Sequence, residues 1–141
     1  MKRRDFLLFA PVAVTAARAA GDSVRGTLTK SGAGKPAVKT RDGRLVELIG
    51  DNPTMLVLSD QRLAGADFEA VGQRKSPDVL EIAPIHTRAM FVHKAGKRLA
   101  VSYWCDICYI RTWAPGKCWC CQEETRLDPV DPATLDDKSS K

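Results

Sequence analysis

Alternating polar and apolar positions between residues 23 and 85 predict a mainly β domain. In residues 23–30, apolar Val24 and Leu28 stand among polar residues, which is typical of a strand with one buried face. The dipeptide Asp42-Gly43 lies between two strand-like runs and predicts a hairpin. The expected strands, in chain order, span residues 23–30, 36–40, 45–49, 66–73 and 78–82.

One short helix is expected between the third and fourth strands, over residues 54–63. Asn52 is a candidate N-cap, Pro53 suits the first helical position and Gly65 suits the helix end. The apolar face of this helix is expected to consist of Met55, Leu56, Leu58 and Leu63. The order of strands with a single helix resembles a small OB-fold barrel, a resemblance that implies the fold and leaves the ligand open.

OB barrels bind single-stranded nucleic acids or sugars through aromatic side chains and a basic groove. Between residues 23 and 80 this chain has one aromatic residue, Phe68, whose apolar neighbours indicate a core position. We therefore expect a protein or a small molecule, and not a nucleic acid, as the partner.

The first nineteen residues have the pattern of an export signal. A basic start containing Arg3 and Arg4 precedes an apolar run over residues 6–17, and Ala17-Arg18-Ala19 fits a cleavage site after Ala19. Residues 3–7, Arg-Arg-Asp-Phe-Leu, resemble the twin-arginine export signal, which implies a periplasmic location. The apolar run is short for a membrane span, so we expect no transmembrane segment in the mature chain, although an uncleaved signal would anchor it.

The net charge changes with removal of this signal. The full chain of 141 residues carries a formal charge of +5, and residues 1–19 hold four basic side chains against one acidic side chain. The mature chain is therefore close to +2, which gives no support to nucleic-acid binding.

All five cysteines of the chain lie within residues 105–121, together with all three tryptophans. Cys105 and Cys108 form one C-x2-C pair, and Cys118 and Cys121 form a second pair nine residues later, with Cys120 inside it. Two such loops can direct four thiolates to one point with tetrahedral geometry. The sequence therefore predicts a metal site or a redox centre here.

The order strand (residues 98–104), cysteine loop, turn (residues 114–116) and cysteine loop resembles zinc ribbons and rubredoxin-like knuckles. The chain departs from these families because Tyr109 and Gln122, and not glycine, follow the two pairs, and because the intervening loop is short. The expected ligands are Cys105, Cys108, Cys118 and Cys121, with Cys120 as the alternative fourth ligand.

Zinc or a single iron suits four thiolates, and zinc is the preferred assignment. In an oxidising compartment the same cysteines could instead pair as disulfides. The preferred function is an exported structural-zinc protein with a binding or scaffold role and without an evident catalytic constellation. The alternatives are a periplasmic single-iron electron-transfer protein, or a thiol-redox or metal-handling protein that uses Cys120.

The remaining expectations concern residues around this cysteine cluster. His86 and His93 are expected to be surface or packing residues, because strand alternation does not bring them to one face. The aromatic residues near the cysteines are expected to pack as scaffold: Tyr103, Trp104, Tyr109, Trp113 and Trp119. The expected organisation is a signal (1–19), an OB-like domain (23–85), a hairpin with the cysteine module (86–127) and a disordered tail (128–141).

Overall fold

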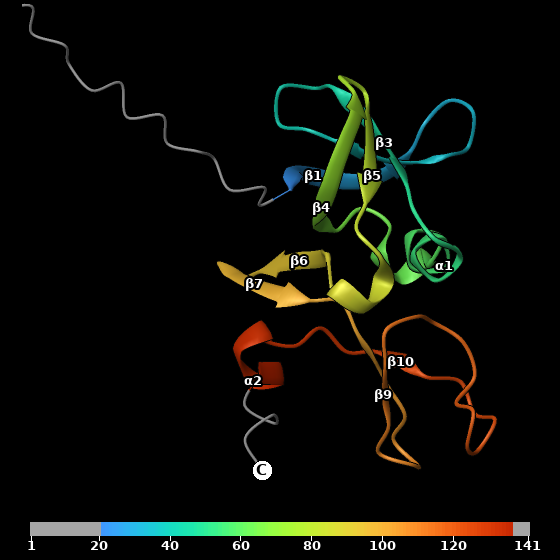
Figure 1. Ribbon diagram of the computed structural model, residues 1–141. Coiled ribbons are helices and arrows are strands. Elements are labelled where there is room, and N and C mark those ends of the chain that lie inside the picture. The colour runs from blue at the N-terminus through green and yellow to red at the C-terminus, as the bar shows by residue number, and fades with distance from the viewer. Residues whose placement is uncertain (1–20, 137–141) are drawn as a thin grey trace, which may run out of the picture.

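Five strands close into a β-barrel in the computed structural model, which describes residues 21–136 (Figure 1). The strands follow one another around the barrel as β1-β2-β3-β5-β4, and β4 pairs again with β1. Only the β3–β5 pair of the barrel is parallel. The bounds are β1 Asp22–Lys30, β2 Pro36–Lys39, β3 Leu45–Ile49, β4 Asp67–Ser76 and β5 Val79–Ile82. The predicted OB-like barrel is confirmed, while residues 1–19, where we predict an export signal, lie outside the described residues.

The barrel closes because apolar side chains of these strands point inward and two glycines let strands approach. Phe68 is fully buried, as predicted, among other core residues such as Leu48 and Leu80. A Cβ atom at Gly26 would collide with the carbonyl of Lys39, and one at Gly72 would collide with the carbonyl of Glu81. Both positions therefore require glycine for strand pairing at this spacing.

Helix α1 (Asn52–Leu58) lies between β3 and β4, but its cap differs from the expected one. Asp51, and not Asn52, is the N-cap, and its two carboxylate oxygens accept the N–H groups of Thr54 at 2.9 Å and Ile85 at 3.0 Å. The helix ends at Leu58. After Ser59 and Asp60, a separate 3-10 helix, η1 (Gln61–Leu63), follows with Asp60 as its N-cap. Asp60 interrupts the single helix that we predicted because its side chain accepts the N–H of Arg62.

Two further expectations for the barrel need correction. Val57 is fully buried in α1, whereas Leu56 is 55% exposed, so the buried face of the helix is rotated from the predicted one. Strand β4 runs on to Ser76, beyond the expected end at residue 73, with a register shift between Arg74 and Ser76.

A hairpin extends the barrel into a seven-stranded sheet. Strand β6 (Met90–Lys94) pairs with β4 and with β7 (Lys97–Ala100), after a short 3-10 segment, η2 (Ile85–Thr87). The hairpin turn consists of Ala95 and Gly96, which both have positive φ angles as in a type I′ turn. The sheet of the barrel therefore continues into the part of the chain that leads to the cysteines.

The cysteine module (residues 101–128) is built on a small second sheet. Strands β8 (Tyr103–Trp104), β9 (Arg111–Thr112) and β10 (Arg126–Leu127) pair in the order β10-β8-β9. Residues 128–136, which we expected to be a disordered tail, include two backbone hydrogen bonds between Val130 and Ala100 and a short helix, α2 (Pro132–Asp136). No helix within residues 21–136 has the length and apolar character needed to cross a membrane.

Tyr103 joins the cysteine module to the barrel. Its side chain is fully buried, and its hydroxyl donates to Asp60 Oδ2 at 2.8 Å. Arg62 pairs with the same carboxylate at 2.9 Å and donates to the Thr125 carbonyl at 3.0 Å. Burial opposes the charge of Asp60, but the hydrogen bonds from Arg62 and Tyr103 lower the pKa of Asp60 overall. Burial and the hydrogen bond to Asp60 raise the pKa of Tyr103, which keeps its hydroxyl a donor.

Replacing Tyr103 by Phe should lower the free energy of unfolding by about 1.5–3 kcal/mol, because a buried carboxylate loses one donor. The measurement is urea denaturation followed by tryptophan fluorescence. Tyr109→Phe is the matched control, since Tyr109 is 76% exposed and should tolerate the loss of its hydroxyl. Equal effects of the two substitutions would contradict the proposed role of the Tyr103–Asp60 contact.

Candidate metal centre

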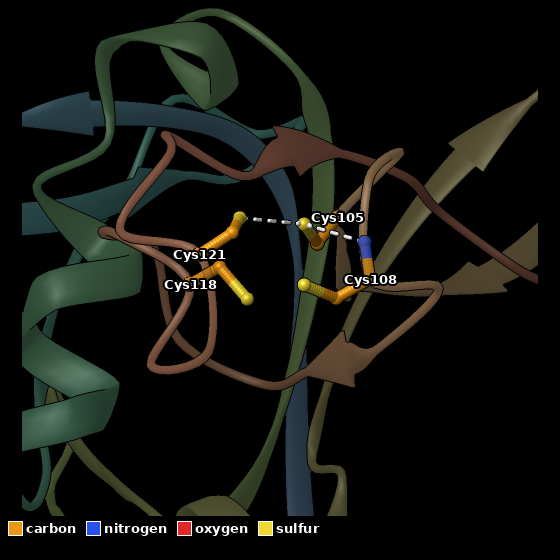
Figure 2. A group of neighbouring side chains, drawn as sticks. All are labelled: Cys105, Cys108, Cys118 and Cys121. Carbon is orange, nitrogen blue, oxygen red and sulfur yellow. Dashed lines mark hydrogen bonds between the residues drawn. The ribbon is translucent and has the colours of Figure 1, made fainter.

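The first cysteine loop begins directly after β8. The Cys105 carbonyl accepts the N–H of Tyr109 at 2.9 Å, and the Cys105 N–H donates to the Ile110 carbonyl at 3.0 Å. The N–H of Cys108 also points at Cys105 Sγ, at 3.4 Å. These bonds fold the loop so that both sulfurs lie on its inner side (Figure 2).

The second cysteine loop repeats this backbone arrangement. The Cys118 carbonyl accepts the N–H of Gln122 at 2.9 Å, and the Cys118 N–H donates to the Glu123 carbonyl at 2.7 Å. Tyr109 and Gln122 occupy equivalent positions and have positive φ angles of 55° and 64°. Zinc-ribbon loops have glycine at these positions, where a positive φ angle is easily adopted. Here Tyr109 and Gln122 adopt the same left-handed backbone conformation although neither is glycine.

Four cysteine sulfurs converge between the two loops. The Sγ atoms of Cys105, Cys108, Cys118 and Cys121 all lie within 4.8 Å of one another, and those of Cys105 and Cys121 are 3.5 Å apart. In Figure 2 the two sulfurs of each loop face those of the other across a shared space. Four sulfurs bound to zinc at about 2.3 Å would be roughly 3.8 Å apart, so this group could hold a metal ion.

The structure brings Cys121, and not Cys120, into this group. Cys120 is exposed at the tip of the second loop, whereas Cys105 and Cys118 are buried and Cys108 and Cys121 are partly buried. All five cysteines are free thiols. The four cysteines preferred from their spacing are therefore the four that lie together.

Backbone amides favour the thiolate form at one of these positions. Hydrogen bonds from the backbone N–H groups of Cys121 and Cys120 lower the pKa of Cys118 to about 7. At Cys108, contact with the thiol of Cys120 and partial loss of solvent raise the pKa instead. The second loop thus supplies a preformed environment for a thiolate, the form that binds metals.

Two arginines brace the module around the sulfurs. Arg111 donates to Ser102 Oγ at 2.7 Å and to Asp128 at 2.9 Å, and its guanidinium lies 4.9 Å from the centre of the Trp104 ring. Arg126 pairs with Asp106 and Asp128, both at 3.1 Å. Asp106 lies within the first cysteine loop and is exposed, and it takes part in this network.

Neither histidine belongs to the sulfur group. His93 Nε2 is 2.8 Å from Glu69, a carboxylate that also binds Arg98 at 2.6 Å on the sheet of the barrel. His86 lies in the η2 segment. Both positions agree with the surface or packing role expected from the sequence.

The aromatic residues divide into two groups. Tyr103 is buried and Trp104 and Trp113 are partly buried, as expected for scaffold residues. Tyr109 and Trp119 are 76% and 73% exposed, so our expectation was wrong for these two. Both lie in or just after the cysteine loops, where the sulfurs point inward and the intervening side chains point to solvent.

Replacing Trp119 by Ala should change the free energy of unfolding by less than about 0.5 kcal/mol, because little surface is buried there. Trp104→Ala is the contrasting variant and should cost more than about 1 kcal/mol, since that ring contacts Arg111 and Tyr109. Thermal unfolding followed by far-ultraviolet circular dichroism would measure both. A larger loss for Trp119→Ala than for Trp104→Ala would show that Trp119 is packed.

Comparison with protein families, curated proteins and solved structures finds no match to this chain. The chemistry of the sulfur group is therefore assigned from its own residues.

Proposed function

We propose that this chain is an exported metal-binding protein in which zinc is held by Cys105, Cys108, Cys118 and Cys121. The observation that supports this assignment most directly is the convergence of four sulfurs from two loops with matching backbone hydrogen bonds. Four protein ligands complete the tetrahedral shell of zinc and leave no position for a substrate, which is typical of a structural site.

The small size of the cysteine module supports a structural role for the metal. Its three strands are two residues each, so regular backbone pairing contributes little to its stability. Structural zinc can supply about 10–16 kcal/mol of apparent binding free energy to a small domain. The metal then fixes the two loops, while the barrel serves as a scaffold or binding domain.

Export is part of the proposal and is supported by the sequence of the first nineteen residues. The twin-arginine route transports folded proteins, so a site metallated before transport would reach the periplasm with its thiols already occupied. Bound metal would then protect these cysteines from disulfide formation in an oxidising compartment.

A single iron is the second candidate, because four thiolates also suit iron. With iron in the site, the hydrogen bond from the Cys108 N–H to Cys105 Sγ would help to set its reduction potential. An iron site would make the purified protein coloured and reducible, whereas a zinc site would leave it colourless.

Cys121→Ser and Cys120→Ser form a matched pair that tests the ligand assignment. The two residues are adjacent, but only Cys121 belongs to the sulfur group. We expect purified wild-type protein and Cys120→Ser to contain one zinc per chain, and Cys121→Ser to lose most of its zinc. The measurement is metal analysis by mass spectrometry together with a free-thiol count.

Three results of that measurement would overturn parts of the proposal. Iron in place of zinc would favour the electron-transfer alternative. Two disulfides without metal would exclude a resident metal. Loss of zinc from Cys120→Ser, with zinc retained in Cys121→Ser, would show that Cys120 and not Cys121 is the fourth ligand.

Removing the metal with a chelator should unfold the cysteine module and leave the barrel folded. All three tryptophans lie in residues 104–119, and residues 21–100 contain none, so tryptophan fluorescence reports on the module alone. Amide hydrogen exchange reports on the barrel through the core residues of β1–β5. We expect a large change in fluorescence with retained protection of barrel amides, and unchanged fluorescence would contradict a structural metal.

A further inference from the structure

We propose that the barrel binds a small organic anion in a cavity on its outer face, formed by β1, the start of β4 and the turn between β2 and β3. The cavity has a volume of about 760 Å³, which lies within the range of small-molecule sites and well above the space that an inorganic ion fills. The inference goes beyond the proposed metal site and does not depend on it, because none of the residues that line this cavity is a cysteine.

Strand register places three of the lining residues in a row. Thr27 of β1 pairs with Lys39 at the end of β2 and with Asp67 at the start of β4. Directly paired residues share one face of a sheet, and Arg25, two residues before Thr27 on β1, lies on that face as well. All four residues are exposed, so the row lies on the outer surface of the barrel.

The turn between β2 and β3 adds Arg41 to this row. The Thr40 N–H donates to the Arg44 carbonyl at 2.8 Å, and the Gly43 N–H donates to the Thr40 carbonyl at 2.9 Å. Gly43 has a φ angle of 86°, a conformation that glycine adopts without strain. These bonds fix the turn from which Arg41 lines the cavity, so a ligand would meet a site whose backbone is already in place.

The charge of the cavity favours an anion. The one acidic side chain of its lining, Asp67, is already paired, because Arg25 Nε and Nη2 donate to its two carboxylate oxygens at 3.1 Å and 2.9 Å. Within residues 21–136, neither Lys39 nor Arg41 forms an ion pair or a side-chain hydrogen bond. Three basic side chains and one acidic side chain give the cavity a formal net charge of +2, and its two unpaired cations are available to a ligand.

A second cavity extends this site along β1. It has a volume of about 600 Å³ and shares Thr27 and Gly65 with the first cavity. Its lining is partly apolar and includes Leu58. An anionic group held by the two unpaired cations would therefore leave room for the rest of an organic molecule beside it. For this reason we assign the site to an organic anion, with a carboxylate or a phosphate as its charged group.

The test is a titration of the full purified chain, followed by its amide NMR spectrum. The probes are succinate as an organic carboxylate, glycerol phosphate as an organic phosphate, inorganic phosphate as a charged group alone and glycerol as an uncharged molecule. We expect at least one of the two organic anions to shift the amides of Thr27, Arg41 and Gly65 saturably, with a dissociation constant of about 1 mM or below. Inorganic phosphate should bind at least about tenfold more weakly, and glycerol should not bind.

Two double variants with the same change in net charge test the residues. Lys39→Ala with Arg41→Ala should weaken binding of the organic anion by about tenfold or more, because both unpaired cations are lost. Lys94→Ala with Lys97→Ala removes two exposed lysines from the β6–β7 hairpin and should leave the affinity within about twofold of wild type. Circular dichroism would check that both variants fold.

No saturable shift with either organic anion up to about 20 mM would overturn the inference. Equal affinity for inorganic phosphate would also overturn it, since the cavity would then recognise charge alone, and so would equal losses of affinity in the two double variants. Binding of a single-stranded oligonucleotide at these residues, without binding of either organic anion, would overturn it in favour of a nucleic acid. Binding of succinate alone would support a carboxylate ligand, and binding of glycerol phosphate alone would support an organic phosphate.

Discussion

The convergence of four sulfurs is the constraint on which the C-terminal part of the structure depends. The strands β8, β9 and β10 are too short to hold the chain between them by backbone pairing alone. Two cysteine loops with matching backbone hydrogen bonds face each other, and the four sulfurs of Cys105, Cys108, Cys118 and Cys121 lie between them. Arg111 and Arg126 link the strands beside these loops through Ser102 and Asp128.

The barrel contributes to the site by holding both ends of the module. Tyr103 lies two residues before Cys105 and binds Asp60, while Thr125 follows the second loop and binds Arg62. Asp60 and Arg62 both belong to the short η1 region of the barrel. The Asp60–Arg62 ion pair of the barrel therefore positions the segments that lead into and out of the sulfur group. The barrel thus supports the cysteine module whether or not it binds a ligand of its own.

Sequence patterns over a few residues predicted the strands of the barrel and the cysteine loops, because neighbouring residues determine both. Strand alternation identified the barrel strands, and cysteine spacing identified the four residues that lie together. The helix cap is displaced by one residue because Asp51 and Asn52 are both good caps, and it is Asp51 that accepts the Thr54 N–H. The second oxygen of Asp51 also accepts the N–H of the distant Ile85, a contact that no local pattern predicts. The Tyr103–Asp60 contact joins residues 43 positions apart, and no local pattern encodes it. The exposure of Trp119 was missed because its apolar character says nothing about the side of a loop on which it lies.

The backbone at the ends of the two loops explains why this module needs a cross-link. Tyr109 and Gln122 adopt left-handed conformations that cost roughly 1–2 kcal/mol for residues with a Cβ atom. Neither residue is glycine, so the loop conformation is disfavoured by its own sequence and must be stabilised by what the loops hold between them. A metal ion held by the four cysteines would meet this need by joining the two loops through four ligands.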